Sequence, residues 1–252
     1  MKTIFPIILI FIGLNLWAQD LISVTYEGYV KSTPPLERYK NNPQKLAEME
    51  RAFEEAAKIP SIHILTLNKN ESSFVLEERI QNNQPSERGM SMVRFTACND
   101  LYINLNNKFI LNEHDLGQKK YVIKDSLKSL DWKITNEKKE ILGLEVRKAA
   151  AVYDSITNVE VWYAPKISFK NGPSQYWGLP GLILEVNESN HYPNGVENQV
   201  RFIATSIDTQ PKSAEIERFE KHKQITQEEY DEILSEMQKV YQEMHDDGVQ
   251  KD

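Results

Sequence analysis

The residues that could act as bases or metal ligands are scattered along the chain. Glu113, His114 and Asp115 could together bind a cation, but a polar turn between strands accounts for the same letters. No two histidines stand two or four residues apart, the spacing that lets imidazoles share a metal; they are His63, His114, His191, His222 and His245. We therefore expect no metal and no cofactor.

Sequence signatures of nucleophilic catalysis and phosphate binding are missing. The chain has no G-x-S-x-G elbow, no phosphate-binding glycine loop and no H-E-x-x-H helix. The single cysteine, Cys98, excludes an internal disulfide, and we interpret it as a small buried residue because no sequence neighbour supplies a base. The 37 acidic residues leave many carboxylate pairs that folding could join. A carboxylate-dependent hydrolase acting on envelope or glycan material stays open as an alternative, with no catalytic residue assigned.

Aromatic residues supply the candidates for ligand binding. Trp162, Tyr163, Tyr176 and Trp177 lie in and around the strand-like runs that flank a bend rich in glycine and proline. On the concave face of a curved sheet these rings could stack on sugar rings or hold an apolar ligand or a peptide. The alternative is that they fill the core.

The bend itself is the hexapeptide GLPGLI. It contains no nucleophile, strong base or metal ligand, so we interpret it as a structural motif. The letters LPGL suit a type II turn with Pro180 at the second position and Gly181, at positive φ, at the third. Gly178 permits close approach of the backbone. The six residues of the motif are Gly178, Leu179, Pro180, Gly181, Leu182 and Ile183.

The elements that must position these residues are mostly strands. Residues 22–31 alternate between apolar and polar, which indicates a strand with one buried face. From 61 to about 208 strand-like runs follow one another, among them 61–67 and 92–97, and the short connections favour antiparallel neighbours. We predict a mainly β (α+β) fold built on a curved antiparallel meander sheet, half-barrel or bowl-like. Counting strands does not decide between this, a closed barrel and a sandwich.

Two amphipathic helices complete the expected fold. Asn42 is a candidate N-cap with Pro43 at the first helical position, so one helix follows the first strand. Thr226 and Glu229 form a capping box that begins a second helix. Its apolar stripe is Tyr230, Ile233, Leu234, Met237, Val240, Tyr241 and Met244. We expect this stripe to pack on the sheet, whereas an exposed stripe would favour a docking role.

The N-terminal residues indicate export. Residues 1–18 carry one lysine, an apolar run and a small residue at the end, which is typical of a secretory signal peptide. The remaining chain has 29 basic and 37 acidic side chains, a formal charge of −8 that disfavours nucleic acid and anionic membranes. We predict a β-rich domain over 19–211 and a C-terminal helical segment over 212–252. The protein is expected in the periplasm or outside the cell, soluble and without a transmembrane anchor.

Residues 131–186 carry a family resemblance. Trp132, Gly143, Lys148 with Ala149, Trp162 with Tyr163, Gly172 with Pro173 and the hexapeptide occur in an order that resembles the GLPGLI family of exported bacterial proteins. The family often has a cysteine near 146–147, where this chain has Val146 and Arg147. The resemblance implies an exported antiparallel β protein, similar in outline to periplasmic lipoprotein carriers, with no established activity. Asp125-Ser126 and Asp154-Ser155 look like an O-glycosylation pattern, or simply turns.

Three functions fit these observations. The leading hypothesis is a non-enzymatic exported protein that binds a ligand or envelope partner in the concavity of its sheet. A carboxylate-dependent hydrolase and a structural subunit of an envelope complex are the alternatives. An enzyme should show converging polar groups with a shifted pKa, and a docking subunit should expose the stripe of its C-terminal helix.

Overall fold

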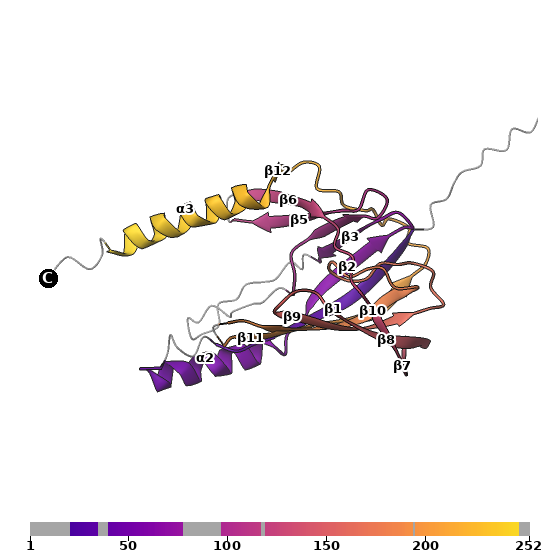
Figure 1. Cartoon of the computed structure of the whole chain (residues 1–252), viewed down its shortest axis with the longest axis horizontal. Helices are drawn as coiled ribbons and strands as arrows, with labels where there is room; N and C mark the ends of the chain where they lie inside the picture. Colours follow the sequence, from indigo (N-terminus) through magenta and orange to yellow (C-terminus); the bar gives the residue numbers. More distant parts are fainter. Residues whose placement is uncertain (1–20, 35–39, 78–96, 117–118, 194, 247–252) are drawn as a thin grey trace, which may run out of the picture.

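The chain folds around one open sheet. The computed structural model describes residues 21–34, 40–77, 97–116, 119–193 and 195–246. Within them, 12 strands form one sheet in the order β12-β6-β5-β4-β3-β2-β1-β11-β10-β9-β8-β7, and two helices flank it (Figure 1). The expected mainly β, largely antiparallel fold is therefore confirmed. The signal peptide and the strand expected at 92–97 lie outside the described residues, apart from Ala97, which belongs to no strand.

The elements have the following bounds. The strands are β1 (Ile22–Ser32), β2 (Ser61–Leu67), β3 (Glu71–Leu76), β4 (Leu101–Asn104), β5 (Phe109–Asp115), β6 (Lys120–Ser126), β7 (Lys133–Ile141), β8 (Leu144–Val152), β9 (Thr157–Ala164), β10 (Leu182–His191), β11 (Glu197–Asp208) and β12 (Lys223–Ile225). The helices are α2 (Pro43–Ala56) and α3 (Gln227–Asp246).

Strand β1 joins the two halves of the sheet. It pairs with β2 on one side and with the distant β11 on the other, so that Tyr26 lies between His63 and Ala204. Strands β2 to β6 and β7 to β11 are each meanders, as short connections predict. A simple meander over the whole chain is wrong in two places, because β11 returns to β1 and β12 pairs in parallel with β6.

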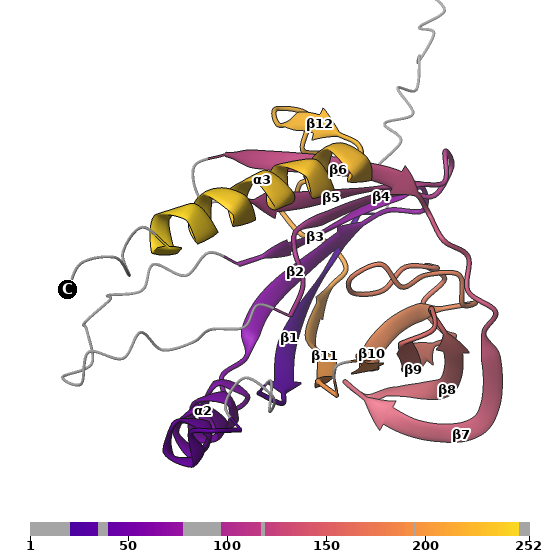
Figure 2. The same cartoon turned by 60° about the vertical axis from the view of Figure 1, so that its left-hand side comes forward.

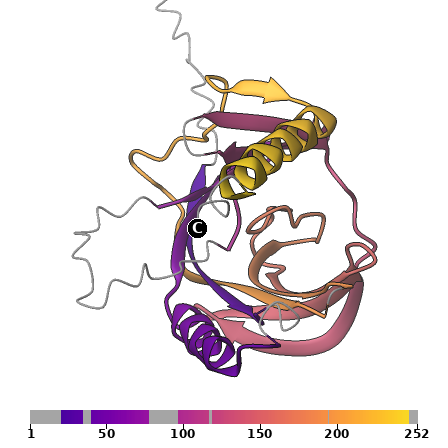
Figure 3. The ribbon, with the colours of Figure 1, turned by 90° about the vertical axis from the view of Figure 1, so that its left-hand side faces the viewer.

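The sheet curves strongly, and its two faces are covered differently. On the concave inner face, Tyr26, Phe74 and Phe202 belong to the main core, which the loop 165–181 covers (Figures 2 and 3). We call this segment the hexapeptide loop. On the outer face, Ile216 and Phe219 from the segment after β11 pack on β4, β5 and β6 in a second, smaller core. The two cores lie on opposite sides of one sheet because side chains alternate along each strand.

Helix α2 begins where the sequence indicates. The Asn42 side chain accepts the backbone N–H of Lys45 at 3.0 Å, and Pro43 follows it. Helix α2 contacts β1, yet none of its residues is buried. Its apolar stripe is therefore only partly covered.

Helix α3 begins with the predicted capping box. Thr226 Oγ1 accepts the N–H of Glu229 at 3.2 Å, and Glu229 Oε2 accepts the N–H of Thr226 at 2.8 Å. The ring of Tyr230 lies 4.5 Å from that of His114. Met237, two turns further on, is 47% exposed. The stripe rests on the sheet at its start and is open to solvent at Met237.

Candidate functional site

The hexapeptide loop is anchored to the inner face through its backbone. Ile183 of β10 donates its N–H to the carbonyl of Asn171 (3.1 Å), and within the loop Gly178 donates to the carbonyl of Lys170 (2.8 Å). Asn171 also donates from Nδ2 to Ser72 Oγ on β3 (2.9 Å), linking β3 to the loop. The loop is therefore an integral part of the core and packs over the strands to which it is hydrogen-bonded.

Tyr176 connects the loop to β10. Its ring is fully buried, and its hydroxyl donates to Glu188 Oε2 at 2.6 Å. Asn190 Nδ2 donates to the other oxygen of Glu188, also at 2.6 Å. Burial, and then the nearby Glu188 carboxylate, raise the pKa of Tyr176 well above its usual range. Tyr176 is thus a neutral donor within the core.

Two tryptophans fasten the loop to the segment that crosses from β6 to β7. Trp132 Nε1 donates to the carbonyl of Trp177, and Trp177 Nε1 donates to the carbonyl of Lys128, both at 2.8 Å. The Lys128 ammonium lies 4.1 Å from the centre of the Tyr153 ring. We call Trp132, Tyr153 and Trp177 the aromatic latch. All three rings stay partly exposed, while their polar atoms have partners.

The four aromatics singled out in the sequence do not form one site. Tyr163 and Tyr176 are buried, with 2% and 0% exposure, and Trp177 belongs to the aromatic latch. Trp162 alternates with Tyr163 along β9 and therefore lies on the outer face, where the Lys139 ammonium is 4.3 Å from its ring centre. Trp132 and Tyr153 were not chosen from the sequence, although Trp132 belongs to the family resemblance. The ligand-binding role of all of these rings stays a prediction.

The two glycines of the motif have the opposite roles to those expected. Gly178, not Gly181, has the positive φ, at 99°. A Cβ on Gly181 would lie 2.3 Å from the carbonyl oxygen of Ala164, so Gly181 is the position of close backbone approach. The predicted type II turn with Gly181 at its third position is therefore wrong, because that turn needs a positive φ there.

Neither His63 nor Cys98 has the setting of a reactive group. His63 is fully buried beside Phe74, and burial lowers its pKa to about 4. Its Nε2 lies 2.9 Å from Ser61 Oγ, which also reaches the carbonyl of Gly28 (3.1 Å). Burial, followed by nearby Asp100, raises the pKa of the Cys98 thiol, which disfavours a thiolate.

The possible cation site at Glu113, His114 and Asp115 is split by strand alternation. His114 points to the inner face toward Tyr230, whereas Glu113 lies on the outer face. Glu113 binds Lys120 Nζ at 2.7 Å and His222 Nε2 at 3.1 Å. No group of three or more histidine, cysteine or acidic side chains suited to a metal occurs within the part of the chain that the structure describes.

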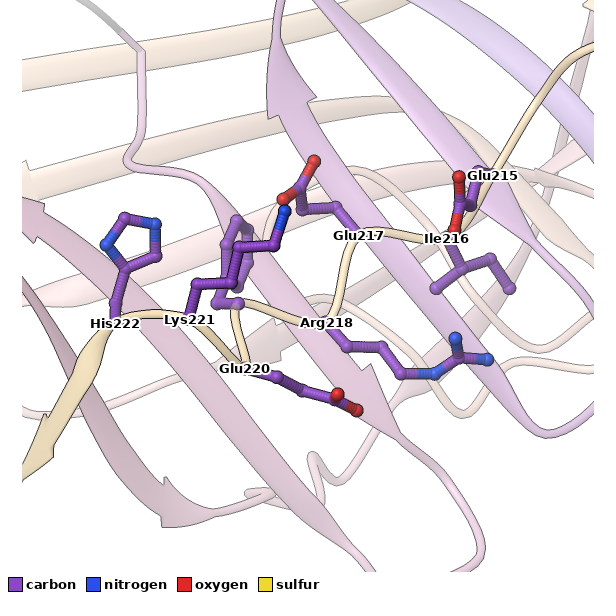
Figure 4. Close-up of a pocket in the computed structure, with 8 residues that line it drawn as sticks. Glu215, Ile216, Glu217, Arg218, Glu220, Lys221 and His222 are labelled. Carbon is purple, nitrogen blue, oxygen red and sulfur yellow. The ribbon is translucent and has the colours of Figure 1, made fainter.

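A pocket of about 340 Å³ opens on the outer face, and no pattern in the sequence pointed to it. An ion pair and a histidine contact hold its wall: Arg218 binds Glu71 at 2.6 Å, and His222 Nε2 lies 3.1 Å from Glu113 Oε2. Tyr102 donates to the same Glu71 carboxylate at 2.6 Å. In Figure 4, His222 lies at one end of the segment that forms this wall and Glu215 at the other, with Arg218 between them. The residues that line this outer-face pocket are Glu215, Ile216, Glu217, Arg218, Phe219, Glu220, Lys221 and His222.

Two carboxylates lie next to the wall of this pocket. The register that pairs Leu101 with Asn112 places Asp100 opposite Glu113, whose N–H donates to the Asp100 carbonyl at 2.9 Å. Burial raises the pKa of Asp100, and Glu113 adds to the rise, although the N–H of Leu76 opposes it. Glu113 is ion-paired, so the two acids occupy different electrostatic settings. Sequence reasoning missed this pair because it depends on the strand register.

Comparison with known proteins adds a family model and a fold. Residues 152–185 match a family model described as a protein of unknown function (Porph_ging). No curated protein matches the sequence. The structure of PNGF-II is similar, with a TM-score of 0.51 and 19% identity, over 84% of this chain and 32% of that one. This chain thus spans about a third of PNGF-II, and the likeness concerns the fold alone.

Two further solved structures give lower TM-scores. An uncharacterised conserved protein from Thermus thermophilus has a TM-score of 0.32 and 9% identity, over 83% of this chain and 92% of that one. A LolA superfamily protein, NE2245 from Nitrosomonas europaea, has a TM-score of 0.25 and 8% identity, over 76% and 87%. Among the described residues, neither helix is apolar and long enough to cross a membrane.

Proposed function

We propose that this chain is an exported, non-enzymatic protein that binds a ligand or an envelope partner on the concave side of a bowl-like sheet. The observation that carries the proposal is the aromatic latch. Trp132 and Trp177 keep part of their rings exposed while both indole N–H groups are bound by carbonyls. What remains for a ligand is ring surface, which suits a sugar ring or an apolar group.

The position of the hexapeptide loop restricts where such a ligand can lie. The loop covers the inner face, and Tyr176 is buried beneath it. A ligand would therefore lie at the rim, against the latch, and the motif would act as its support. We also propose that residues 1–18 direct export and that the chain belongs with the GLPGLI proteins.

The first experiment identifies what the protein binds. The tagged parent and Trp177→Ala are purified from the native envelope, and small molecules that co-purify are measured by mass spectrometry. Tyr192→Leu is the matched control, because it removes an exposed aromatic ring that belongs neither to the latch nor to any of the proposed sites. We expect a molecule that is retained by the parent and the control and lost from Trp177→Ala. Equal retention by all three proteins would contradict the proposal.

A titration gives the quantitative test. Maltohexaose and oleate represent the sugar and apolar classes, and tryptophan fluorescence follows their binding. Removing one stacked ring should weaken binding at least about tenfold, which corresponds to ~1.4 kcal/mol. If neither probe binds and nothing co-purifies, the latch is a structural device only.

The outer-face pocket favours a second candidate, a hydrolase that uses Asp100 as acid and Glu113 as base. Two carboxylates in different electrostatic settings beside a cavity are the pattern of general acid–base sites. Asp100→Asn should then abolish hydrolysis of nitrophenyl glycosides by the parent while leaving the fold intact by circular dichroism. An inactive parent would remove this candidate.

A further inference from the structure

Trp162 and Glu185 form a compact pair on the outer face. They are direct partners in the register between β9 and β10, so their side chains lie on the same face. The Glu185 side chain is only 5% exposed, whereas the Trp162 ring is partly open. The pair therefore presents a ring face beside a desolvated carboxylate.

Lys139 reaches across from the edge strand β7 and contacts both members of this pair. Its ammonium is ion-paired with Glu185 and lies 4.3 Å from the centre of the Trp162 ring. Lys139 comes from β7, which two strands separate from β10. A carboxylate and an aromatic face are the two groups that recognise an ammonium ion, and both act on the same nitrogen here.

Other residues hold the carboxylate independently of Lys139. Arg201 contacts Glu185 Oε1 through Nε and Nη2, both at 3.2 Å, and Asn187 Nδ2 reaches the same oxygen at 3.2 Å. Burial opposes ionisation, but the bonds from Lys139 and Asn187 keep the pKa of Glu185 below its usual value. Arg201 and Asn187 both hold Oε1, so the carboxylate would stay in place, with Oε2 open, if the lysine left.

The edge strand can release Lys139 more readily than a central strand could. The register between β7 and β8 shifts between Ile134 and Lys138, so only the short run from Lys138 to Ile141 pairs around Lys139. The lysine side chain is 36% exposed. Solvent therefore reaches this side chain, and a competing cation could replace its ammonium.

We propose that Trp162 and Glu185 are a binding site for a primary alkylammonium group and that Lys139 is its internal occupant. The competing ammonium belongs to a free amine or to a lysine side chain of a partner. No other ammonium can bind while Lys139 fills the site. The apparent affinity for an added amine is therefore the intrinsic affinity multiplied by the fraction of time for which the site is empty. Removing Lys139 opens the site, and a bound amine frees the lysine from Glu185.

The test uses Lys139→Ala and n-butylammonium chloride, which reproduces the four-carbon stem and the ammonium of lysine. Tryptophan fluorescence follows the titration, with sodium chloride at equal ionic strength as the control. We expect saturable binding to Lys139→Ala, at least about tenfold tighter than to the parent. The double variant Lys139→Ala, Trp162→Leu should lose it. The peptide Gly-Lys-Gly, blocked at both ends, separates a partner lysine from a free amine as the source.

Two results would overturn the proposal: Lys139→Ala binds butylammonium no more tightly than the parent, or the double variant binds it equally well. A second measurement applies even if Lys139→Ala does not fold. Reductive methylation in the parent is read by peptide mass spectrometry as the ratio of Lys139 to the exposed Lys31 in the same sample, because butylamine itself consumes formaldehyde. This ratio should increase with butylammonium relative to equal sodium chloride, and an unchanged ratio would show that the amine does not displace Lys139.

Discussion

Gly181→Ala tests the central claim about the motif, that this glycine exists for close backbone approach. The added Cβ would lie 2.3 Å from the oxygen and 2.7 Å from the carbon of the Ala164 carbonyl, and 2.9 Å from Pro165 Cα. All three are backbone atoms at the end of β9, so no rotamer change relieves the overlap. Overpacking of this kind costs about 1–3 kcal/mol. Weakening the pairing of Leu182 with Ala164 adds about 1 kcal/mol.

The assay is urea unfolding followed by tryptophan fluorescence, with thermal melting as a check. The expected loss of about 2–4 kcal/mol corresponds to a fall in melting midpoint of about 5–15 °C for a chain of this size. Gly143→Ala is the control, because Gly143 has a positive φ of 74° and no heavy atom near its Cβ position. It isolates backbone strain of about 1–2 kcal/mol. If both variants lose the same stability, the steric reasoning for Gly181 is refuted.

Three further predictions concern polar side chains and their partners. The pKa of His63 is depressed to about 4 from an ordinary 6.5, so the unfolded chain binds the extra proton first and stability should fall as pH drops from 6.5 to 4, by up to ~3 kcal/mol. The free energy of unfolding is measured by urea titration at several pH values in this range. It should depend less on pH in His63→Gln than in the parent, and an equal dependence would contradict the assignment. Tyr176→Phe removes the hydroxyl that donates to Glu188 and should cost about 1–2 kcal/mol in the same assay, whereas no loss would mean that the bond has no net effect. The Arg218 guanidinium leads the groups that lower the pKa of Glu71, so this pair contributes stability above about pH 4.5 that decreases on further acidification. The difference in melting temperature between Arg218→Gln and the parent should therefore be smaller at pH 3 than at pH 7, and an equal difference at both pH values would contradict the assignment.

Local patterns predicted most elements well. The alternation in β1 and the caps at Asn42 and Thr226 depend on residues a few positions apart, so a single pass along the chain finds them. Strand β12 was missed because three residues carry too little pattern. The candidate site was predicted poorly. Trp162 and Tyr163 are adjacent in sequence, yet strand alternation sends them to opposite faces.

The sequence by itself determined the β-rich character, the two helices and the position of the bend, because side-chain periodicity, caps and glycine placement act over short distances. Only the tertiary structure decided which strands meet. The pairing of β1 with β11 brings the two meanders together, and the register between β4 and β5 sets Asp100 against Glu113. The coil of β7 to β10 sets Lys139 on Trp162 and Glu185. A shift of one residue in any register would move these groups to the opposite face, which no local pattern specifies.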